Sequence, residues 1–482
     1  MRMLWVTAVV LLAAASRLDA ADDELVVHEW GTFTTLQDED GAPISGINTD
    51  DEPVPDFVHR LARSFFLSPS EAPPAFFQGA PRCHPDVTMR LETPVLYFYP
   101  NGGKIPPPFD VGVKFRGGWL TEFFPAAEAI APGFDADEPD RPFPGAPALQ
   151  ESRFDRGFGS LKADASAELL WKGVKLAVPG SGPETDDPVW LAPRAVQAAM
   201  LETIHGEREK FLFYRGVGTA RAALQVRRDV HQQTLAINDS APAADLSSTD
   251  HLNKIPSAWL VHVRADGTCA VRSAGELPQG KSPRWTVPAS FAPAEFSHAN
   301  LSRLQDEMRA ALVRAGLFTD EAEALLRTWQ VSYFKSPGLR LFYLCSQAEV
   351  EKLLPLEISV PAKITRVMIG RVEIVTPEQR ALLAKIAAGP SVELWKMRGP
   401  TGASDFFKDP QNVRRWNAVM EGRAPLRDLG VPIPEIYGAY LELGRFRNAL
   451  LLDEAKRRST PALAEFIKTN SFDFYKITLP RQ

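Results

Sequence analysis

The sequence predicts an α+β protein, with an antiparallel, β-rich and sandwich-like front part and a mixed, helix-rich back part. Up to about residue 290, short runs of aromatic and branched residues alternate with Gly, Pro and Asn turns. From about residue 297, apolar residues recur at helical spacing and helix-capping sequences appear. With 45% hydrophobic and 24% charged residues, the composition is that of a globular protein.

The front part is predicted to consist mainly of strands. Residues 93–99 are rich in aromatic and branched side chains and precede a Pro-Asn-Gly-Gly turn. Residues 111–115 and 119–124 flank an Arg-Gly-Gly turn, which predicts a hairpin. A second hairpin is predicted where residues 258–264 and 268–272 enclose an Asp-Gly dipeptide, because that dipeptide adopts the positive φ angles of a tight turn.

Helices are predicted mainly in the back part, with one in the front part over residues 194–204. Ser346 and Thr376 each begin a capping box, which fixes the start of a helix. Two strands, 339–344 and 367–375, are predicted between the back-part helices. The back-part helices are predicted over residues 299–314, 320–329, 347–354, 377–388, 411–420, 434–456 and 461–468.

The chain is too long for one ordinary domain. The change of texture places a boundary within residues 285–294, which are rich in proline and small residues. The expected organisation is therefore a signal peptide over residues 1–20, a β-rich domain over 21–290 and a mixed α/β domain over 295–482.

The first 20 residues have the layout of a secretory signal peptide. Arg2 gives a positive start, residues 4–15 are apolar, and a small residue, Ala20, precedes the expected cleavage site. The apolar run is shorter than the roughly 20 residues that span a bilayer, although an uncleaved interfacial anchor is the alternative. We expect export to the periplasm, cell surface or medium, with no membrane span after cleavage.

The three cysteines allow one disulfide at most.

The net charge of −6 hides an asymmetry along the chain. Residues 21–60 carry a net charge of −10, whereas residues 61–482 sum to about +3. A pI near 5.9 without a long basic stripe argues against a nucleic-acid partner. The one basic cluster, residues 456–458 with Arg445 and Arg447, is predicted to be a solvated helix face.

Groups that could do chemistry lie soon after the leader. His28 and Glu29 are candidate catalytic residues, and His28, His84 and Asp86 are ligand types for a divalent metal such as zinc. On a strand, His28 and Glu29 point to opposite faces, so one site could use both only if the strand is bulged. The structural alternative is that His28 packs in a core while Glu29 pairs with Arg90 or another arginine.

A second candidate metal site is the acidic loop that follows. Asp38, Asp40, Asp50 and Asp51 offer carboxylate oxygens, the ligands that calcium takes. The spacing is not that of an EF-hand loop. The alternative is a solvated acidic turn without a metal.

Aromatic residues make up 10% of the chain. Trp30, Trp119 and Trp190 could line a sugar-binding face, and core packing is the alternative use of such residues. The sequence leaves both alternatives open.

Three segments together resemble an uncharacterised family of exported bacterial proteins that begin in this way. They are VHEWGTFT at residues 27–34, RLETPVLYFY at 90–99 and FLFYRG at 211–216. The resemblance covers most of the mature chain and implies export. It implies no known activity and no assigned catalytic residue.

Two functions are consistent with these observations. The first is a binding or structural protein of the periplasm or cell surface, whose partner is an unknown surface or envelope ligand. The second is a secreted metal-assisted hydrolase that uses the His28, Glu29, His84 and Asp86 region with a divalent ion, calcium or zinc. Convergence of His28 and His84 in one cleft would distinguish the second function from the first.

Overall fold

The structure is a computed structural model that describes most of the chain. The predicted signal peptide and most of the predicted helix over residues 411–420 lie outside the described residues. The described residues are 24–48, 54–61, 76–77, 80–81, 83–101, 104–132, 161–240, 254–278, 282–330, 333–334, 336–389, 409, 411–412, 414–415 and 435–467.

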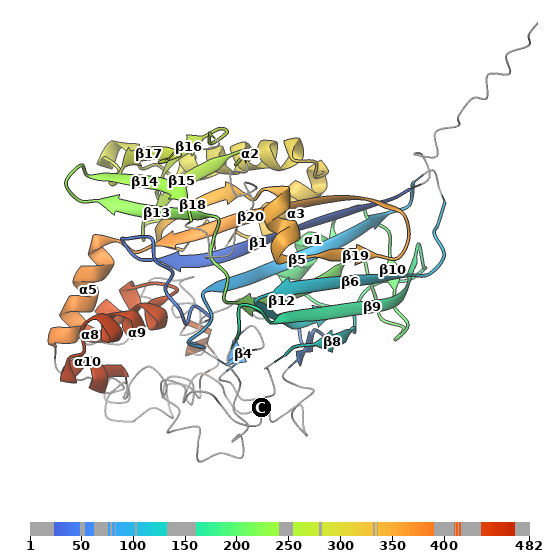
Figure 1. The fold of residues 1–482 in the computed structure, drawn as a ribbon, viewed down its shortest axis with the longest axis horizontal. Helices are drawn as coiled ribbons and strands as arrows, with labels where there is room; N and C mark the ends of the chain where they lie inside the picture. The colour runs from blue at the N-terminus through green and yellow to red at the C-terminus, as the bar shows by residue number, and fades with distance from the viewer. Residues whose placement is uncertain are drawn as a thin grey trace, which may run out of the picture.

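A nine-stranded sheet forms the centre of the molecule (Figure 1). Its middle strand is β1 (Leu25–Gln37), which is buried along nearly its whole length. β1 pairs in parallel with β20 (Ala362–Ile374) and antiparallel with β5 (Met89–Tyr99). The order is β16 (Cys269–Ala274), β15 (Ala258–Val263), β18 (Gly338–Leu344), β20, β1, β5, β12 (Leu212–Gly218), β7 (Gly118–Phe124) and β2 (His59–Arg60).

A six-stranded sheet covers part of one face of the nine-stranded sheet. Val27 and Phe98 of the large sheet share a buried core with Val113 and Trp171 of the smaller one. This packing of two mainly antiparallel sheets is the sandwich-like arrangement expected of the front part. The smaller sheet contains β11 (Arg208–Glu209), β10 (Leu201–Glu202), β9 (Ser166–Leu176), β6 (Phe109–Arg116) and β19 (Leu356–Ile358), with β8 (Glu128–Ile130) also paired to β9.

Three helices cover the other face of the large sheet (Figure 1). They are α1 (Pro188–Arg194), α2 (Ala299–Arg314) and α3 (Thr319–Thr328). Buried side chains of α2 and α3 pack against Trp30 of β1 in one hydrophobic core. No helix in the described ranges is long and apolar enough to cross a membrane.

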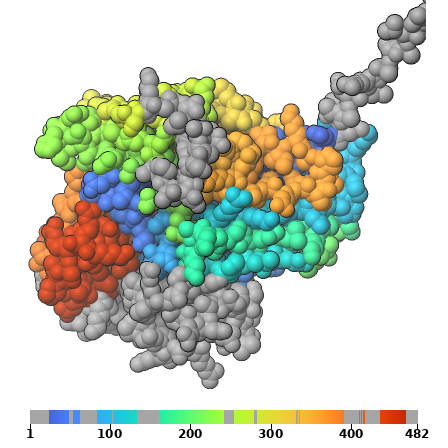
Figure 2. All heavy atoms as spheres, viewed as in Figure 1, coloured from blue at the N-terminus to red at the C-terminus, as the bar shows by residue number. Residues whose placement is uncertain are grey.

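A small sheet and the C-terminal helices pack near the C-terminal end of β1. A three-stranded sheet of β13 (Leu224–Asp229), β14 (Thr234–Asp239) and β17 (Trp285–Pro288) packs on β15 and β18. Near the C-terminal end of β1 the C-terminal helices pack against residues of the front part, as Figure 2 shows in orange, red and blue. These helices are α5 (Pro377–Ala388), α8 (Glu435–Glu442), α9 (Arg447–Arg457) and α10 (Pro461–Phe466).

The α+β class is confirmed, with antiparallel sheets in the front half and most helices in the back half. The large sheet nevertheless crosses the boundary predicted within residues 285–294. β18 and β20 come from beyond residue 295, and they pair with β15 and β1 from the front part. Composition along the chain does not determine strand order, so it did not indicate that the β-rich front part and the helix-rich back part share a sheet.

Two local predictions were wrong because distant segments take part in the structure. β6 and β7 do not form a hairpin, since Gly117, at φ +69°, turns the chain from the small sheet into the large one. The helix predicted over residues 194–204 lies earlier in the chain. It is α1, which begins after its cap Asp187 and ends at Arg194. Leu201 and the residue after it join the small sheet through β9.

The predicted helix over residues 434–456 is broken in the structure. Gly444 adopts φ +84° between α8 and α9, a conformation that glycine reaches without strain. The break turns Arg445 toward the interior, where its side chain is only 11% exposed, and Arg447 is also buried. The solvated helix face predicted for these two arginines is therefore wrong, whereas Arg457 and Arg458 of the same predicted cluster are 45% and 63% exposed.

A partly buried carboxyl lies at the start of α4 (Gln347–Leu353). The Glu349 carboxylate accepts a hydrogen bond from the Tyr343 hydroxyl at 3.2 Å, and the backbone N–H of Glu349 donates to the Ser346 hydroxyl at 3.2 Å. Burial raises the pKa of Glu349 to about 7. The folded protein therefore binds a proton here at pH values where the unfolded chain does not.

We expect Glu349→Gln to change how stability depends on pH. The wild-type contribution is complete below the unfolded pKa near 4.5 and is lost as the pH rises through about 7. The variant should therefore gain about 1–3 kcal/mol over the wild type between pH 5 and pH 8. Urea unfolding at both pH values measures this, with Glu351→Gln, an exposed position of the same helix, as the control. Equal pH dependence in all three proteins would contradict the prediction.

Candidate functional site

His28 lies on the face of β1 that α3 covers. Its Nδ1 lies 2.8 Å from Oε2 of Glu321, whose other oxygen accepts a hydrogen bond from the Tyr99 hydroxyl at 2.7 Å. Glu321 also accepts the backbone N–H of Phe318 at 2.6 Å, closing the start of α3. The ring of Phe318 packs on His28 at 4.5 Å between centroids. These contacts fasten α3 to β1.

Glu29 points to the opposite face, as strand geometry predicts. It is fully buried, and it accepts hydrogen bonds from the Tyr214 hydroxyl and from Nε of Arg366. Arg366 therefore fills the role that the sequence left to Arg90 or another arginine. The contacts link β1 to β12 and β20, and His28 and Glu29 do not face one site.

His84 lies far from His28 in the sheet. Its ring packs edge-on against Trp119 of β7 at 5.3 Å, and its Nδ1 accepts the backbone N–H of Asp86 at 3.2 Å. β7 is three strands away from β1 in the sheet, which corresponds to about 14 Å. Through the strand register, Trp119 lies opposite Thr34 of β1, six residues along the strand from His28. Within the described ranges, no three His, Cys, Asp or Glu side chains are grouped closely enough to hold a metal ion.

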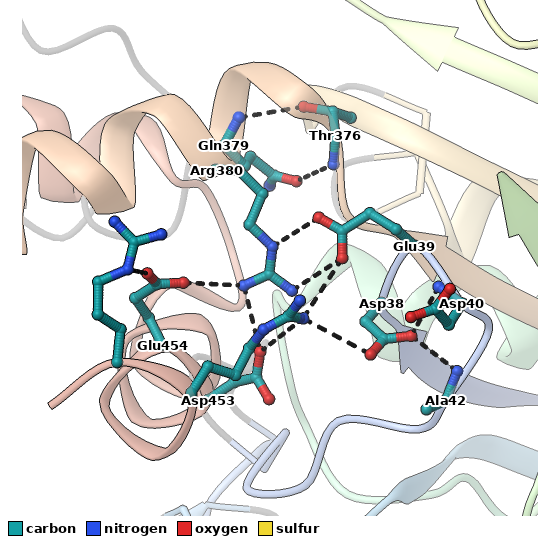
Figure 3. Close-up of polar contacts among 11 residues, drawn as sticks. Asp38, Glu39, Asp40, Ala42, Thr376, Gln379, Arg380, Asp453 and Glu454 are labelled. Carbon is teal, nitrogen blue, oxygen red and sulfur yellow. Dashed lines mark hydrogen bonds and ion pairs between the residues drawn. The ribbon is translucent and has the colours of Figure 1, made fainter. Parts of the chain in front are cut away.

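The acidic loop is bound by arginines from the back part of the chain (Figure 3). Glu39 holds Arg380 through two contacts, at 2.6 and 3.1 Å, and lies 3.4 Å from Arg457. Asp38 accepts the backbone N–H groups of Asp40 and Ala42.

Arginine side chains thus meet the described part of this loop, where the sequence suggested calcium or solvent. Asp38 itself lies 3.6 Å from Arg457. The two other candidate ligands, Asp50 and Asp51, lie outside the described residues.

An aromatic pocket lies between the large sheet and the layer of α1 and α3. The centres of water molecules can occupy a volume of about 40 Å³ in this pocket. A cavity needs about 10–15 Å³ of such volume to hold one water. The space therefore holds roughly three waters. The residues that line it are Trp30, Val54, Pro55, Glu92, Thr93, Val95, Asp187, Val189, Trp190, Pro193, Phe211, Phe213, Arg215, Thr328, Trp329, Tyr333 and Arg445.

Irregular sheet geometry is concentrated at this pocket. The register of β1 against β5 shifts between Trp30 and Thr32, and that of β12 against β5 shifts between Phe213 and Gly216. Thr93 has φ +48°, an outlying conformation for a β-branched residue. Bulges and backbone strain are concentrated at binding and catalytic sites in proteins, which marks the pocket as the candidate site.

Glu92 carries a buried negative charge beside the pocket. It accepts hydrogen bonds from Thr34 at 2.7 Å, from Arg445 at 2.9 Å and from the Tyr333 hydroxyl, and it pairs with Arg90 at 2.8 Å. Burial alone would raise the pKa of Glu92, but the charges of Arg90 and Arg445 outweigh it and hold the pKa well below its usual range. Four donors take up the acceptor capacity of this carboxylate.

Trp329 contributes a buried donor to the same pocket. Its ring stacks on Tyr333 at 4.5 Å, yet its indole N–H has no acceptor among the described residues. The indole of Trp190, across the pocket, donates instead to Glu209 at 2.9 Å. A buried donor without an acceptor costs about 1–3 kcal/mol, which an acceptor atom of a ligand would relieve.

Comparisons with known proteins give no family for this chain. No family model matches it, and no curated protein matches it. The function must therefore be inferred from the geometry of the site itself.

The sequence pointed to only part of this site. Trp30 and Trp190, two of the three candidate sugar-binding tryptophans, do line the pocket, whereas Trp119 packs against His84. Glu92 and Arg445 were not foreseen as a pair. The available signal was a pair of charged residues, Arg90 and Glu92, inside a mostly apolar strand, which indicates buried ion pairing.

We expect Arg380→Gln to destabilise the protein more than Arg457→Gln. The Arg380 side chain is 17% exposed and holds Glu39 through two contacts, whereas the Arg457 side chain is 45% exposed. The losses in the free energy of unfolding should be about 2 kcal/mol for Arg380 and under about 1 kcal/mol for Arg457. Chemical denaturation measures both losses. Equal losses would show that Arg380 does not contribute more than Arg457 to holding the acidic loop.

Proposed function

We propose that this chain is an exported binding protein that holds a small molecule in the aromatic pocket. The observation that carries the proposal is the buried indole N–H of Trp329, which lacks an acceptor among the described residues beside open space. Apolar walls with a few fixed polar groups are typical of small-molecule sites. The walls come from segments far apart in the sequence, so the pocket depends on the complete fold.

The export part of the proposal rests on the leader sequence. Residues 1–20 have the charge, apolar run and small residue that signal peptidase requires. N-terminal sequencing of protein recovered from outside the cytoplasm should begin at Ala21. A mature chain that still begins at Met1 would contradict it.

Binding is favoured over metal-assisted hydrolysis by the placement of the candidate ligands. His28 is engaged with Glu321, while His84 lies against Trp119, three strands away. The hydrolase required these two histidines to converge, and they do not. No observation in the described residues supplies another set of ligands.

Filling the pocket should abolish binding. Val189 lines the pocket from α1, whereas Leu191 on the same short helix is 42% exposed and does not line it. We expect Val189→Trp to weaken binding at least tenfold and Leu191→Trp to leave it unchanged. The measurement is saturation-transfer NMR with indole, butyrate, butyramide and butylammonium as probes.

Two outcomes would contradict the proposed function. The first is that no probe binds the wild-type protein. The second is that a probe binds equally well to both tryptophan variants, which would place binding outside the pocket. Thermal unfolding of each variant confirms that the fold is intact before binding is compared.

A further inference from the structure

We infer that the ligand of the aromatic pocket is a small organic cation that also carries a hydrogen-bond acceptor. This inference rests on the proposed function, that the pocket binds a small molecule. It concerns the chemical class of that molecule. A carboxylate without a cation, the tryptophans of the walls and a donor without an acceptor support it.

The charged residues that line the pocket differ in how they are paired. They are Glu92, Asp187, Arg215 and Arg445. Arg445 donates to Glu92 and Arg215 donates to Glu122, so both arginines already hold a carboxylate. Asp187 lies within ion-pair distance of no lysine or arginine in the described part of the chain. The pocket therefore has a place for a positive charge at Asp187.

The other two carboxylates in this network do not need a further cation. Arg90 lies 2.8 Å from Glu92, and Arg60 lies 3.1 Å from Glu122. Each of these carboxylates is thus held by a second arginine in addition to the one that lines the pocket. This pairing leaves Asp187 as the partner of a ligand cation.

Asp187 lies where the pocket meets the surface. Asp187 and Val189 are partly exposed, whereas Trp30 and Trp329 are buried in the same pocket. The Asp187 carboxylate accepts the backbone N–H of Val189 at 2.9 Å as the cap of α1, which fixes its position. Burial raises the pKa of Asp187 although this hydrogen bond lowers it, and a bound cation would favour the charged form.

The aromatic walls suit a cation as well. Trp30, Trp190 and Trp329 line the pocket, and tryptophan is the aromatic residue that attracts a cation most strongly over its ring. No arginine or lysine in the described ranges lies over these three rings. By contrast, the guanidinium of Arg371 lies 4.2 Å from the ring centre of Tyr333. The pocket therefore offers tryptophan rings that no cation of the described protein occupies.

The buried indole N–H of Trp329 sets a second requirement. It has no acceptor among the described residues, so the ligand needs an acceptor atom apart from its cationic group. Space for roughly three waters limits the chain that joins the two groups to a few atoms. A short amino ether or amino alcohol has both groups.

The first test compares three probes that share one tail and differ in charge. Butylammonium, butyramide and butyrate are titrated into the full mature chain, and NMR measures each affinity. Butylammonium should bind about tenfold more tightly than either of the others, because it alone brings a cation to Asp187. This comparison needs only the wild-type protein, so it does not depend on how any variant folds.

A matched pair of variants tests the role of Asp187. Asp187→Asn removes the charge and keeps the cap of α1, because asparagine caps helices as well as aspartate does. It should reduce the preference for butylammonium over butyramide about tenfold. Asp186→Asn makes the same change at an exposed neighbour that does not line the pocket, so the preference should stay within about twofold of the wild type. Thermal unfolding checks that both variants are folded.

A second pair of probes tests the acceptor. Methoxyethylammonium has the length of butylammonium, with an ether oxygen in place of one methylene group. It should bind the wild type about fivefold more tightly than butylammonium, and Trp329→Phe should remove this difference. Trp171→Phe should keep the difference, because the Trp171 indole does not line the pocket and donates to Pro125 in the small sheet.

The results separate this inference from the proposed function. If butyramide or butyrate binds as tightly as butylammonium, or if indole alone binds, the cationic class is wrong and the binding function stands. If Asp187→Asn keeps the full preference, Asp187 does not hold the cation and the inference is overturned. If the ether has no advantage in the wild type, the acceptor part is wrong. If no probe binds at all, both proposals fail.

Discussion

Glu29 and Glu92 carry charge into the interior from the two central strands, β1 and β5. A buried carboxylate is tolerated only when cations and hydrogen-bond donors surround it, and removing one partner of such a pair costs several kcal/mol. Arg366 meets Glu29 from β20, and Arg445 meets Glu92 from between two C-terminal helices. Pairing of these charges therefore requires segments hundreds of residues apart to assemble around β1 and β5.

The aromatic pocket lies where this assembly departs from regular sheet geometry. Gly216 permits the close approach of β7, because a Cβ there would lie 2.0 Å from the carbonyl oxygen of Trp119. Thr93 holds a positive φ next to Glu92, and such strain persists only where the surrounding contacts enforce it. Glu92 and Arg445 of the buried charge network thus form a polar end of the pocket.

Opposite charges bring the acidic front of the mature chain into contact with helices of the back part. The front of the mature chain is strongly acidic, and its loop at Glu39 meets Arg380 of α5 and Arg457 of α9. α9 also follows the helix break at Gly444, next to which Arg445 pairs with Glu92. The contact of the acidic loop with these helices therefore supports the position of a pocket residue that lies far from the loop in sequence.

The sequence by itself determined the class of the fold, several helices and the opposite orientation of His28 and Glu29, because these depend on local periodicity and capping. The helix over residues 299–314 and the caps at Ser346 and Thr376 match the structure for this reason. Only the tertiary structure decided the strand order, the sheet shared by both halves and the pairing of Glu92 with Arg445. These depend on which distant segments bury each other's charges and apolar faces, and that choice leaves no periodic trace in the chain.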